Sequence, residues 1–243
     1  QLLYDNPDAN LTTTPCYNGK LSAVPWIRTA ASGSSSYERA FSYYYDRVGR
    51  DTAAIYAERT TASTGAFTIT NGWNENRITY DANGNLLTLF RDSTSQGSGG
   101  HTPIDNLAYT YDTNNPNQLQ KVTDGTGAQY TNSGFRNRTG STSSYTYDGN
   151  GNLTNEPYKG FSSIAYNVLN KTDRVNFTVS VNRYIDYTYD ASGNLIRKRQ
   201  YDNSGGAPIL LNTTDYIDGF VYTTVASVQT LQYFAMPEGR VLN

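Results

Sequence analysis

The chain has few of the residues on which enzymes most often depend. Its 243 residues include one cysteine and one histidine. Cys16 alone excludes a disulfide framework within the chain, and a catalytic triad or a histidine-rich metal site would have to depend on His101 alone. We therefore expect Cys16 to be a small packing residue and His101 to lie in a surface loop. We expect no catalytic, cofactor or metal site, and so no enzyme.

Charge is also scarce, because charged residues make up 16% of the chain and the formal net charge is −2. This balance gives no basic face for nucleic acid. No run of about 18 apolar residues occurs, so we expect no membrane span. The chain begins at Gln1 rather than methionine, and we expect a processed piece of a longer protein. Its single thiol fits an exported bacterial protein, secreted or associated with the cell envelope.

Tyrosine is abundant instead, with 22 positions, and asparagine, threonine, serine and glycine are also common. Threonine, tyrosine and valine favour strands, while glycine and asparagine favour turns. No window shows apolar residues at the helical period of 3.6. The aromatic and β-branched residues are too many for a disordered chain. We predict an all-β protein.

One short unit recurs, in which alternating tyrosines run into Asp-x-x-Gly-Asn-Leu. Its irregular spacing favours hairpins with variable returns over a solenoid of fixed period. The clean copies are Tyr80–Leu86, Tyr147–Leu153 and Tyr189–Leu195, and the degenerate ones are Tyr17–Leu21, Tyr45–Arg50, Tyr111–Leu119 and Tyr166–Lys171.

The unit predicts a β-hairpin with a tight turn. Tyrosines two residues apart lie on one face of a strand, and the aspartate can accept hydrogen bonds from the N–H groups that follow it. The third residue after it must adopt a positive φ, which glycine tolerates best and asparagine next best. We predict a type I turn with a G1 bulge. The turn residues are Asp46, Gly49, Asp81, Gly84, Asp148, Gly151, Asn170, Asp190 and Gly193.

Seven or eight such hairpins would give roughly 14–16 strands, and sheets of that size curl. We predict a single array over residues 1–243, with repeats over about 17–222, that forms a large antiparallel curled sheet and part of a shell or spiral. Such a ribbon has two free edges. We therefore expect edge-to-edge self-association, or a neighbouring strand in the full-length protein.

The Tyr-x-Tyr-Asp-x-x-Gly-Asn-Leu units resemble the YD repeats of bacterial Rhs proteins, the toxin-complex C subunits and the teneurins. The closing segments Tyr216–Tyr222 and Pro237–Val241 look like the end of the array in Bacteroidetes-type members. The resemblance implies a non-catalytic β-shell that encloses or presents a polymorphic, toxin-like C-terminal domain. The core module, with its glycine-rich motif and self-cleaving aspartate, and the toxin domain would lie beyond Asn243. The implied partner is thus the chain's own downstream core and C-terminal domain.

Two other functions compete with the scaffold. A cell-surface carbohydrate-binding or adhesion module would use exposed aromatic rings, and the loops that hold Tyr44 and Trp73 are the first places to look. Packing is the default role of alternating tyrosines, however. A glycoside hydrolase would need two carboxylates that converge in a cleft, and no spacing brings a particular pair of glutamates together.

Overall fold

The computed structural model describes residues 1–6, 8–28, 37–59, 65–69, 72–94, 101–126, 134–137, 142–178 and 182–242. The described residues form strands and turns and include no helix, which confirms the all-β prediction. The chain divides into two compact units, Gln1–Phe135 and Arg136–Asn243. A single array across both units stays a prediction.

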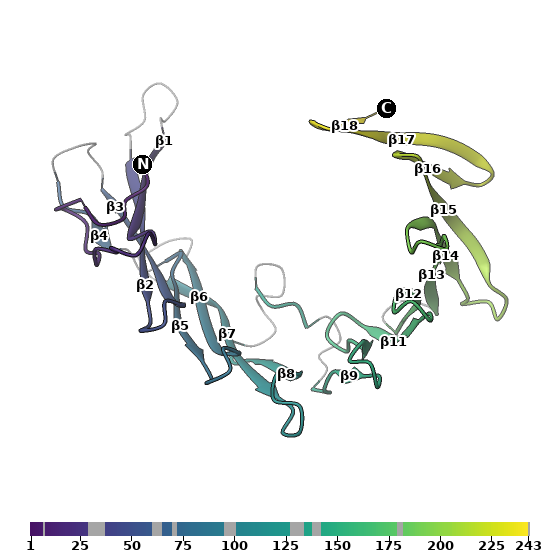
Figure 1. The fold of residues 1–243 in the computed structure, drawn as a ribbon, viewed down its shortest axis with the longest axis horizontal. Helices are drawn as coiled ribbons and strands as arrows, with labels where there is room; N and C mark the ends of the chain where they lie inside the picture. The colour runs from purple at the N-terminus through teal and green to yellow at the C-terminus, as the bar shows by residue number, and fades with distance from the viewer. Residues whose placement is uncertain are drawn as a thin grey trace. The chain divides into compact units, whose positions relative to one another are not determined.

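Unit 1, Gln1–Phe135, contains one eight-stranded sheet (Figure 1). Its strand order is β1-β2-β3-β5-β6-β7-β8, and the short β4 pairs with β3. The strands are β1 (Ala23–Arg28), β2 (Tyr37–Tyr45), β3 (Asp51–Arg59), β4 (Thr68–Ile69), β5 (Glu75–Tyr80), β6 (Leu86–Thr94), β7 (His101–Tyr111) and β8 (Leu119–Asp124).

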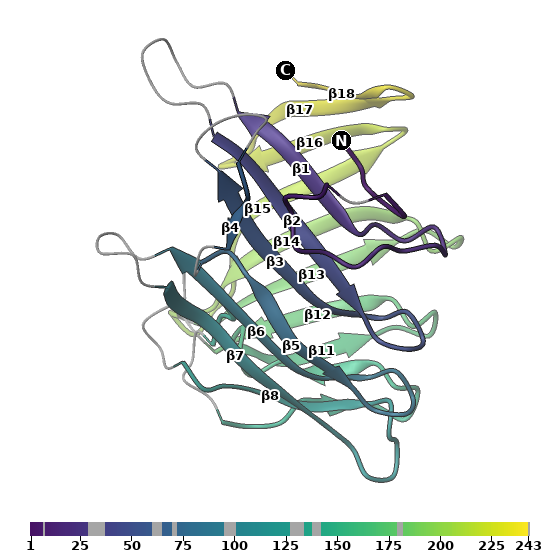
Figure 2. The ribbon, with the colours of Figure 1, turned by 90° about the vertical axis from the view of Figure 1, so that its left-hand side faces the viewer.

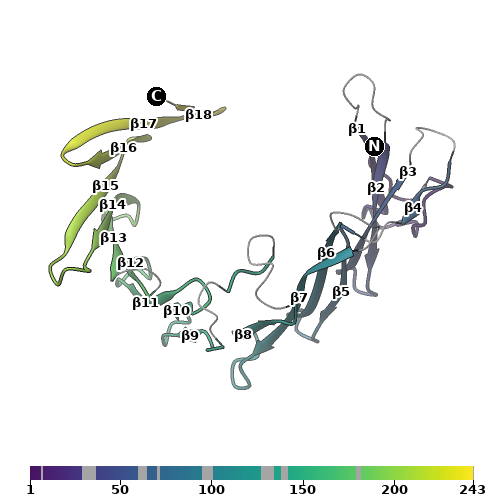
Figure 3. The same cartoon turned by 180° about the vertical axis from the view of Figure 1, so that it is seen from behind.

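Unit 2, Arg136–Asn243, contains a two-stranded ribbon, β9 with β10, and an eight-stranded sheet in the order β11 to β18. The eight-stranded sheet curves along its length when it is seen from behind (Figure 3). The strands are β9 (Thr146–Tyr147), β10 (Leu153–Asn155), β11 (Phe161–Tyr166), β12 (Thr172–Phe177), β13 (Arg183–Tyr189), β14 (Leu195–Asp202), β15 (Ile209–Ile217), β16 (Phe220–Val225), β17 (Val228–Met236) and β18 (Gly239–Leu242).

Every pairing among the described strands is antiparallel, as predicted for tandem hairpins. Strands that follow one another in the sequence mostly lie side by side, because short turns join them. In unit 1 the turns after β2, β5 and β7 therefore lie together at one end of the strands (Figure 2). Asp46, Gly49, Asp81 and Gly84 therefore lie at this end of the strands.

The two faces of the unit 1 sheet differ in what covers them. On one face the rings of Trp26, Phe41 and Tyr56 form a cluster with centroids 5.5–6.3 Å apart. The other face carries small alanines, including the directly paired Ala40 and Ala57. There the N-terminal segment crosses the sheet and buries its leucines on the alanines, so this segment supplies a second layer. The buried cluster comprises Leu3, Leu11, Ala23, Ala40 and Ala57.

A buried arginine fastens that second layer to the sheet. The side chain of Arg59 is 7% exposed and forms an ion pair with Glu38 on the neighbouring strand. Its guanidinium also donates to the carbonyl of Gly65 at 2.8 Å and lies over the ring of Phe67. Asp8 from the N-terminal segment approaches it to 3.7 Å. One cation thus links three segments that are distant in sequence.

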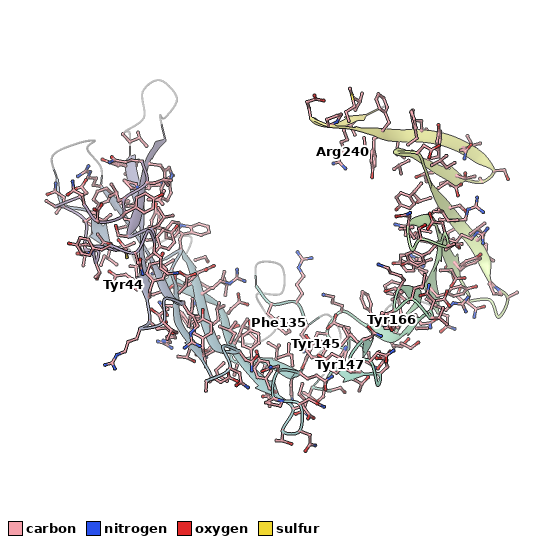
Figure 4. The ribbon with its side chains drawn as sticks, viewed as in Figure 1. Tyr44, Phe135, Tyr145, Tyr147, Tyr166 and Arg240 are labelled. Carbon is pink, nitrogen blue, oxygen red and sulfur yellow. The ribbon has the colours of Figure 1, made fainter. Side chains whose placement is uncertain are left out.

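In unit 2, aromatic pairs form across neighbouring strands. Tyr184 on β13 stacks on Tyr201 on β14 with centroids 4.6 Å apart, and these residues are register partners. Phe220 lies 5.5 Å from its register partner Phe234. Arg240, at the edge of the sheet in Figure 4, places its guanidinium 5.3 Å from the ring centroid of Tyr233. Cross-strand ring contacts of this kind stabilise a sheet locally.

Candidate functional site

Five of the repeated turns share one backbone geometry; they begin at Asp46, Asp81, Asp148, Asn167 and Asp190. The N–H of the residue three positions after the first turn residue donates to the first residue's carbonyl at 2.9–3.2 Å, and the first residue's N–H donates to the carbonyl of the fifth at 2.9–3.0 Å. A shift in strand register accompanies each turn, as in a G1 bulge. The residue with positive φ has values of 85°, 90°, 83°, 53° and 83° at Gly49, Gly84, Gly151, Asn170 and Gly193.

The aspartate at the start of the turn accepts hydrogen bonds from backbone N–H groups that have no strand partner in the tight bend. In the turns that begin at Asp46, Asp148 and Asp190, Oδ1 accepts the N–H groups of the third and fifth residues at 2.8–3.0 Å. Asn167 does the same with its amide oxygen. This arrangement requires a short side chain with an acceptor at its tip.

The second carboxylate oxygen has its own partner, the side chain of the fifth turn residue. The amides of Asn85, Asn152 and Asn194 donate to the Oδ2 of their aspartates at 2.7–2.9 Å. In the turn at Asp46 the guanidinium of Arg50 takes this place at 2.7 Å.

These donors stabilise the ionised carboxylates. The pKa values of Asp81, Asp148 and Asp190 are held below their ordinary value, chiefly by the asparagine side-chain amides and then by the backbone N–H groups.

Asn170 replaces glycine in its turn and gains contacts that glycine could not make. Its φ of 53° is left-handed, which asparagine tolerates. Its Oδ1 accepts the Nδ2 groups of Asn150 and Asn152, both in the preceding turn, at 3.0 and 3.1 Å. The substitution therefore links two turns of unit 2.

Tyrosine hydroxyls join successive hairpins. Four of them donate to the carbonyl of the residue that follows the preceding turn, at 2.8–2.9 Å. Partial burial of these phenols is the largest cause of their raised pKa values. In these repeats the last tyrosine therefore ties its hairpin to the hairpin before it. The pairs are Tyr45 with Leu21, Tyr80 with Asp51, Tyr111 with Leu86, and Tyr166 with Leu153; Tyr166 is labelled in Figure 4.

Cations at the turn tips reinforce these links in unit 1. The ammonium of Lys20 lies 4.9 Å from the ring centroid of Tyr45, and the guanidinium of Arg50 lies 4.5 Å from that of Tyr80. The arginine also donates to the carbonyl of Asp81 at 3.1 Å. Each cation thus contacts the tyrosine of the next hairpin.

Ion pairs cross the strands away from the turns. Arg174 and Asp186 are register partners on β12 and β13, with Nε and Oδ1 2.5 Å apart. Asp105 is fully buried, forms an ion pair with its register partner Arg91, and accepts the N–H of Phe135. These carboxylates each face a cation or an N–H donor, so their charge is used in structure.

The first proposed glycan contact, Tyr44, lies on β2 (Figure 4) and is only partly exposed. Its hydroxyl donates to the carbonyl of Thr12 in the N-terminal segment at 3.2 Å. The side chain therefore helps to hold that segment on the sheet.

The second proposed glycan contact, Trp73, is 52% exposed and lies just before β5. It has a φ of 61°, a value that is unusual for a bulky residue. The register places the two aromatic residues apart. Glu75, two residues after Trp73, pairs with Ala54 on β3, whereas Tyr44 belongs to β2 on the far side of that strand.

The reactive residue types remain scattered. His101 begins β7, so the prediction that it lies in a loop is wrong; strand pairing with Thr94 extends to this residue. Cys16 is partly buried, and its Sγ lies 3.6 Å from the carbonyl of Thr14. In the described ranges no cluster of three or more metal-ligating side chains is found. None of the described residues belongs to a helix long and apolar enough to cross a membrane.

The sequence contains a signal for one of the two contacts that were not predicted, and none for the other. The asparagine after the turn glycine is present in all three clean repeats, and this recurrence is a signal for the Oδ2 contact. The tyrosine links join residues 13–29 positions apart, and no local pattern points to their acceptors. Fold and turns together define an all-β protein of tandem antiparallel hairpins.

Comparison with known proteins adds little to this class. No protein-family model matches the chain, and no curated protein matches it. Among solved structures the chain is similar to TcdB2-TccC3, crystallised without its hypervariable C-terminal region, with 12% identity and a TM-score of 0.22. The match covers 92% of this chain and 15% of the other. A TM-score this low carries no argument about function.

Proposed function

We propose that the chain is a segment of a non-catalytic β-shell of the YD-repeat type, from a bacterial protein that is secreted or associated with the cell envelope. In this proposal the hairpin array encloses or presents a polymorphic, toxin-like domain further along the same polypeptide. The repeats are a structural scaffold in this proposal, and any catalytic activity belongs to the enclosed domain.

The observation that supports the proposal is the tyrosine link between hairpins. In four repeats the hydroxyl of the last tyrosine donates to the carbonyl of the residue after the preceding turn. Three of these links lie in unit 1 and one lies in unit 2. The turn aspartates likewise accept bonds from backbone N–H groups and from the side chains of their own turns. A repeated spacing device of this kind suits a protein that extends a surface.

The test uses the natural reading frame that contains this chain. The product with the segment encoded after residue 243 is compared with a product that lacks residues 1–243, and both are digested with a nonspecific protease. We expect the downstream segment to be cleaved at least tenfold more slowly when the repeats are present. Gly84→Val and Gly193→Val, which strain the turns, should restore rapid cleavage. Equal cleavage of both products, or a frame that ends at residue 243, would contradict the proposal.

A further inference from the structure

Two of the three clean repeats carry asparagine directly before the turn glycine, as Asn83-Gly84 and Asn150-Gly151, whereas the third carries Ser192. Asparagine is a thermally labile residue, because the backbone nitrogen of the next residue can attack its side-chain carbonyl carbon. A following glycine leaves that nitrogen unshielded, since it has no side chain. Asn83 and Asn150 are both exposed at the tips of their turns, so their surroundings decide how readily each one reacts.

The side chain of Asn150 is held by the neighbouring turn. Its Nδ2 donates to Oδ1 of Asn170 at 3.0 Å, and the N–H of Gly151 donates to the carbonyl of Asp148 at 3.0 Å. The two groups that must meet in the attack, the side-chain amide and the glycine nitrogen, are therefore both bonded elsewhere. The reaction at Asn150 requires both hydrogen bonds to open together.

The side chain of Asn83 lacks the first of these restraints. Its amide has no hydrogen-bond partner in the part of the chain that the structure describes. The N–H of Gly84 donates to the carbonyl of Asp81 at 3.2 Å, the longest of these contacts in the five turns. The same carbonyl also accepts Nη1 of Arg50 at 3.1 Å. A single long hydrogen bond thus restrains the reacting nitrogen, and nothing restrains the amide.

We propose that Asn83 is a site of spontaneous deamidation and that Asn150 is protected from it by Asn170. Solvent base removes the N–H proton of Gly84, and the nitrogen attacks Cγ of Asn83. The bond from Cγ to Nδ2 breaks, ammonia leaves with a proton from water, and a five-membered succinimide ring remains. Water then opens the ring at either carbonyl, which gives aspartate or isoaspartate at position 83.

Isoaspartate changes the turn because the main chain then runs through the former side chain and gains one methylene. The N–H of Asp81 donates to the carbonyl of Asn85 at 3.0 Å, and the N–H of Asn85 donates to Oδ1 of Asp81 at 2.8 Å. A longer main chain disturbs both bonds. The side chain of Asn85 also bonds to Pro116 and Asn117 in the next turn, so that contact weakens too. Deamidation does not depend on the scaffold role, because it requires only the folded turn.

The experiment incubates the purified chain at mildly alkaline pH, both folded and in urea. Peptide mass spectrometry with electron-based fragmentation then measures aspartate and isoaspartate at each position. We expect the folded chain to react about fivefold faster at Asn83 than at Asn150, the factor that one hydrogen bond contributes, and the two rates to be similar in urea. Equal folded rates, a difference that persists in urea, or no reaction at Asn83 while the chain in urea reacts, would overturn the proposal.

Asn170→Gly tests the protection of Asn150 directly. The variant removes the Oδ1 acceptor, while glycine readily adopts the left-handed φ of this position. We expect the rate at Asn150 to rise about fivefold and the rate at Asn83 to stay the same. An unchanged rate at Asn150 would overturn the protective role of Asn170.

Asn83→Ser is the matched control for the effect on the turn, because Ser192 has the same place in the third clean repeat. After the same incubation the wild type should melt at a lower temperature than before, with faster hydrogen exchange in β5 and β6. The variant should be unchanged by the incubation. Equal melting of the incubated wild type and variant would overturn the expected effect on the turn.

Discussion

At the scale of single residues, each of the five repeated turns depends on one left-handed torsion and one acceptor side chain. The two requirements are separable, because the glycine provides the backbone conformation and the aspartate satisfies the N–H groups that the bend exposes. Asn167 and Asn170 show that amides can meet both requirements, with Oδ1 of Asn167 as acceptor and a φ of 53° at Asn170.

The turn at Asp148 allows the torsion to be tested without a change in packing. Gly149 and Gly151 both face open space, but only Gly151 has a positive φ, of 83°. Gly151→Ala should therefore lower the free energy of unfolding by about 1 kcal/mol, whereas Gly149→Ala should be neutral or slightly stabilising. Urea unfolding of both variants measures the difference, and equal effects would show that φ is not the cause.

The carboxylates of the turns predict how stability depends on pH. Because the folded-state pKa of Asp190 is lowered, its contribution is present above the unfolded value of about 3.9 and is lost as the pH falls through the folded value. Asp190→Asn keeps an acceptor for the backbone N–H groups but removes the titration. We expect the wild type to lose more stability than this variant when urea midpoints at pH 5 and pH 3 are compared. Parallel losses would refute the assignment.

Turn chemistry is the part of the site that is most accessible from sequence, because donor and acceptor lie within four residues of each other. The spacing of Asp81 and Gly84 is enough to suggest a bend and a positive φ. The amide of Asn85 that reaches back to Asp81 depends on a rotamer, which no residue pattern specifies. The hydrogen bonds of Asn85 to Pro116 and Asn117 join different turns and depend on how hairpins stack.

At the scale of elements, hairpins are joined by side chains as well as by strand pairing. Strand pairing fixes the register of neighbours, and the tyrosine hydroxyls add a second tie at the turn edge. Tyr111, on β7, reaches the carbonyl of Leu86 at the start of β6. Removal of such a hydroxyl leaves the carbonyl with fewer hydrogen bonds and weakens the contact between the strands near the turns.

The tyrosine tie can be removed by one oxygen. Tyr111→Phe should lower the free energy of unfolding by about 0.5–1.5 kcal/mol, because a part-buried hydrogen bond is lost while the ring remains. Tyr17→Phe is the matched control, since that tyrosine is largely exposed, and it should have almost no effect. Chemical denaturation of both variants measures the two free energies of unfolding. Equal effects would show that the Tyr111 hydrogen bond does not stabilise the fold.

The buried ion pair between Arg59 and Glu38 should stabilise unit 1 far more than a surface ion pair does. Arg59→Met leaves the carboxylate of Glu38, whose side chain is 13% exposed, without its cation. We expect a loss of about 3–5 kcal/mol. Arg183→Met, which breaks a pair with Asp202 at 3.5 Å on an arginine that is half exposed, should cost less than about 1 kcal/mol. Similar costs in thermal denaturation would contradict the role of burial.

At the scale of the whole molecule, the all-β class and the antiparallel order follow from the sequence because they are repeated along it. Alternation, turn residues and the absence of helical periodicity all agree, and such agreement specifies a fold class. The second layer on unit 1 depends on single contacts instead. Leu3 and Leu11 lie outside any repeat, and nothing in their local sequence indicates that they cover Ala40 and Ala57.

The division into two units predicts separate responses to mutation. Leu11 is buried in the cluster of unit 1, and its replacement by alanine should cost that unit about 2–5 kcal/mol through lost burial and the cavity that remains. If the units are separate cooperative structures, hydrogen exchange measured by mass spectrometry should quicken in β2 and β3 and stay unchanged in β13 and β14. Val175→Ala on β12 is the reciprocal control, because it alters a buried residue of unit 2. Faster exchange in both units after Leu11→Ala would show that the hairpins unfold as one array, because loss of a single layer would then be felt along every strand pairing.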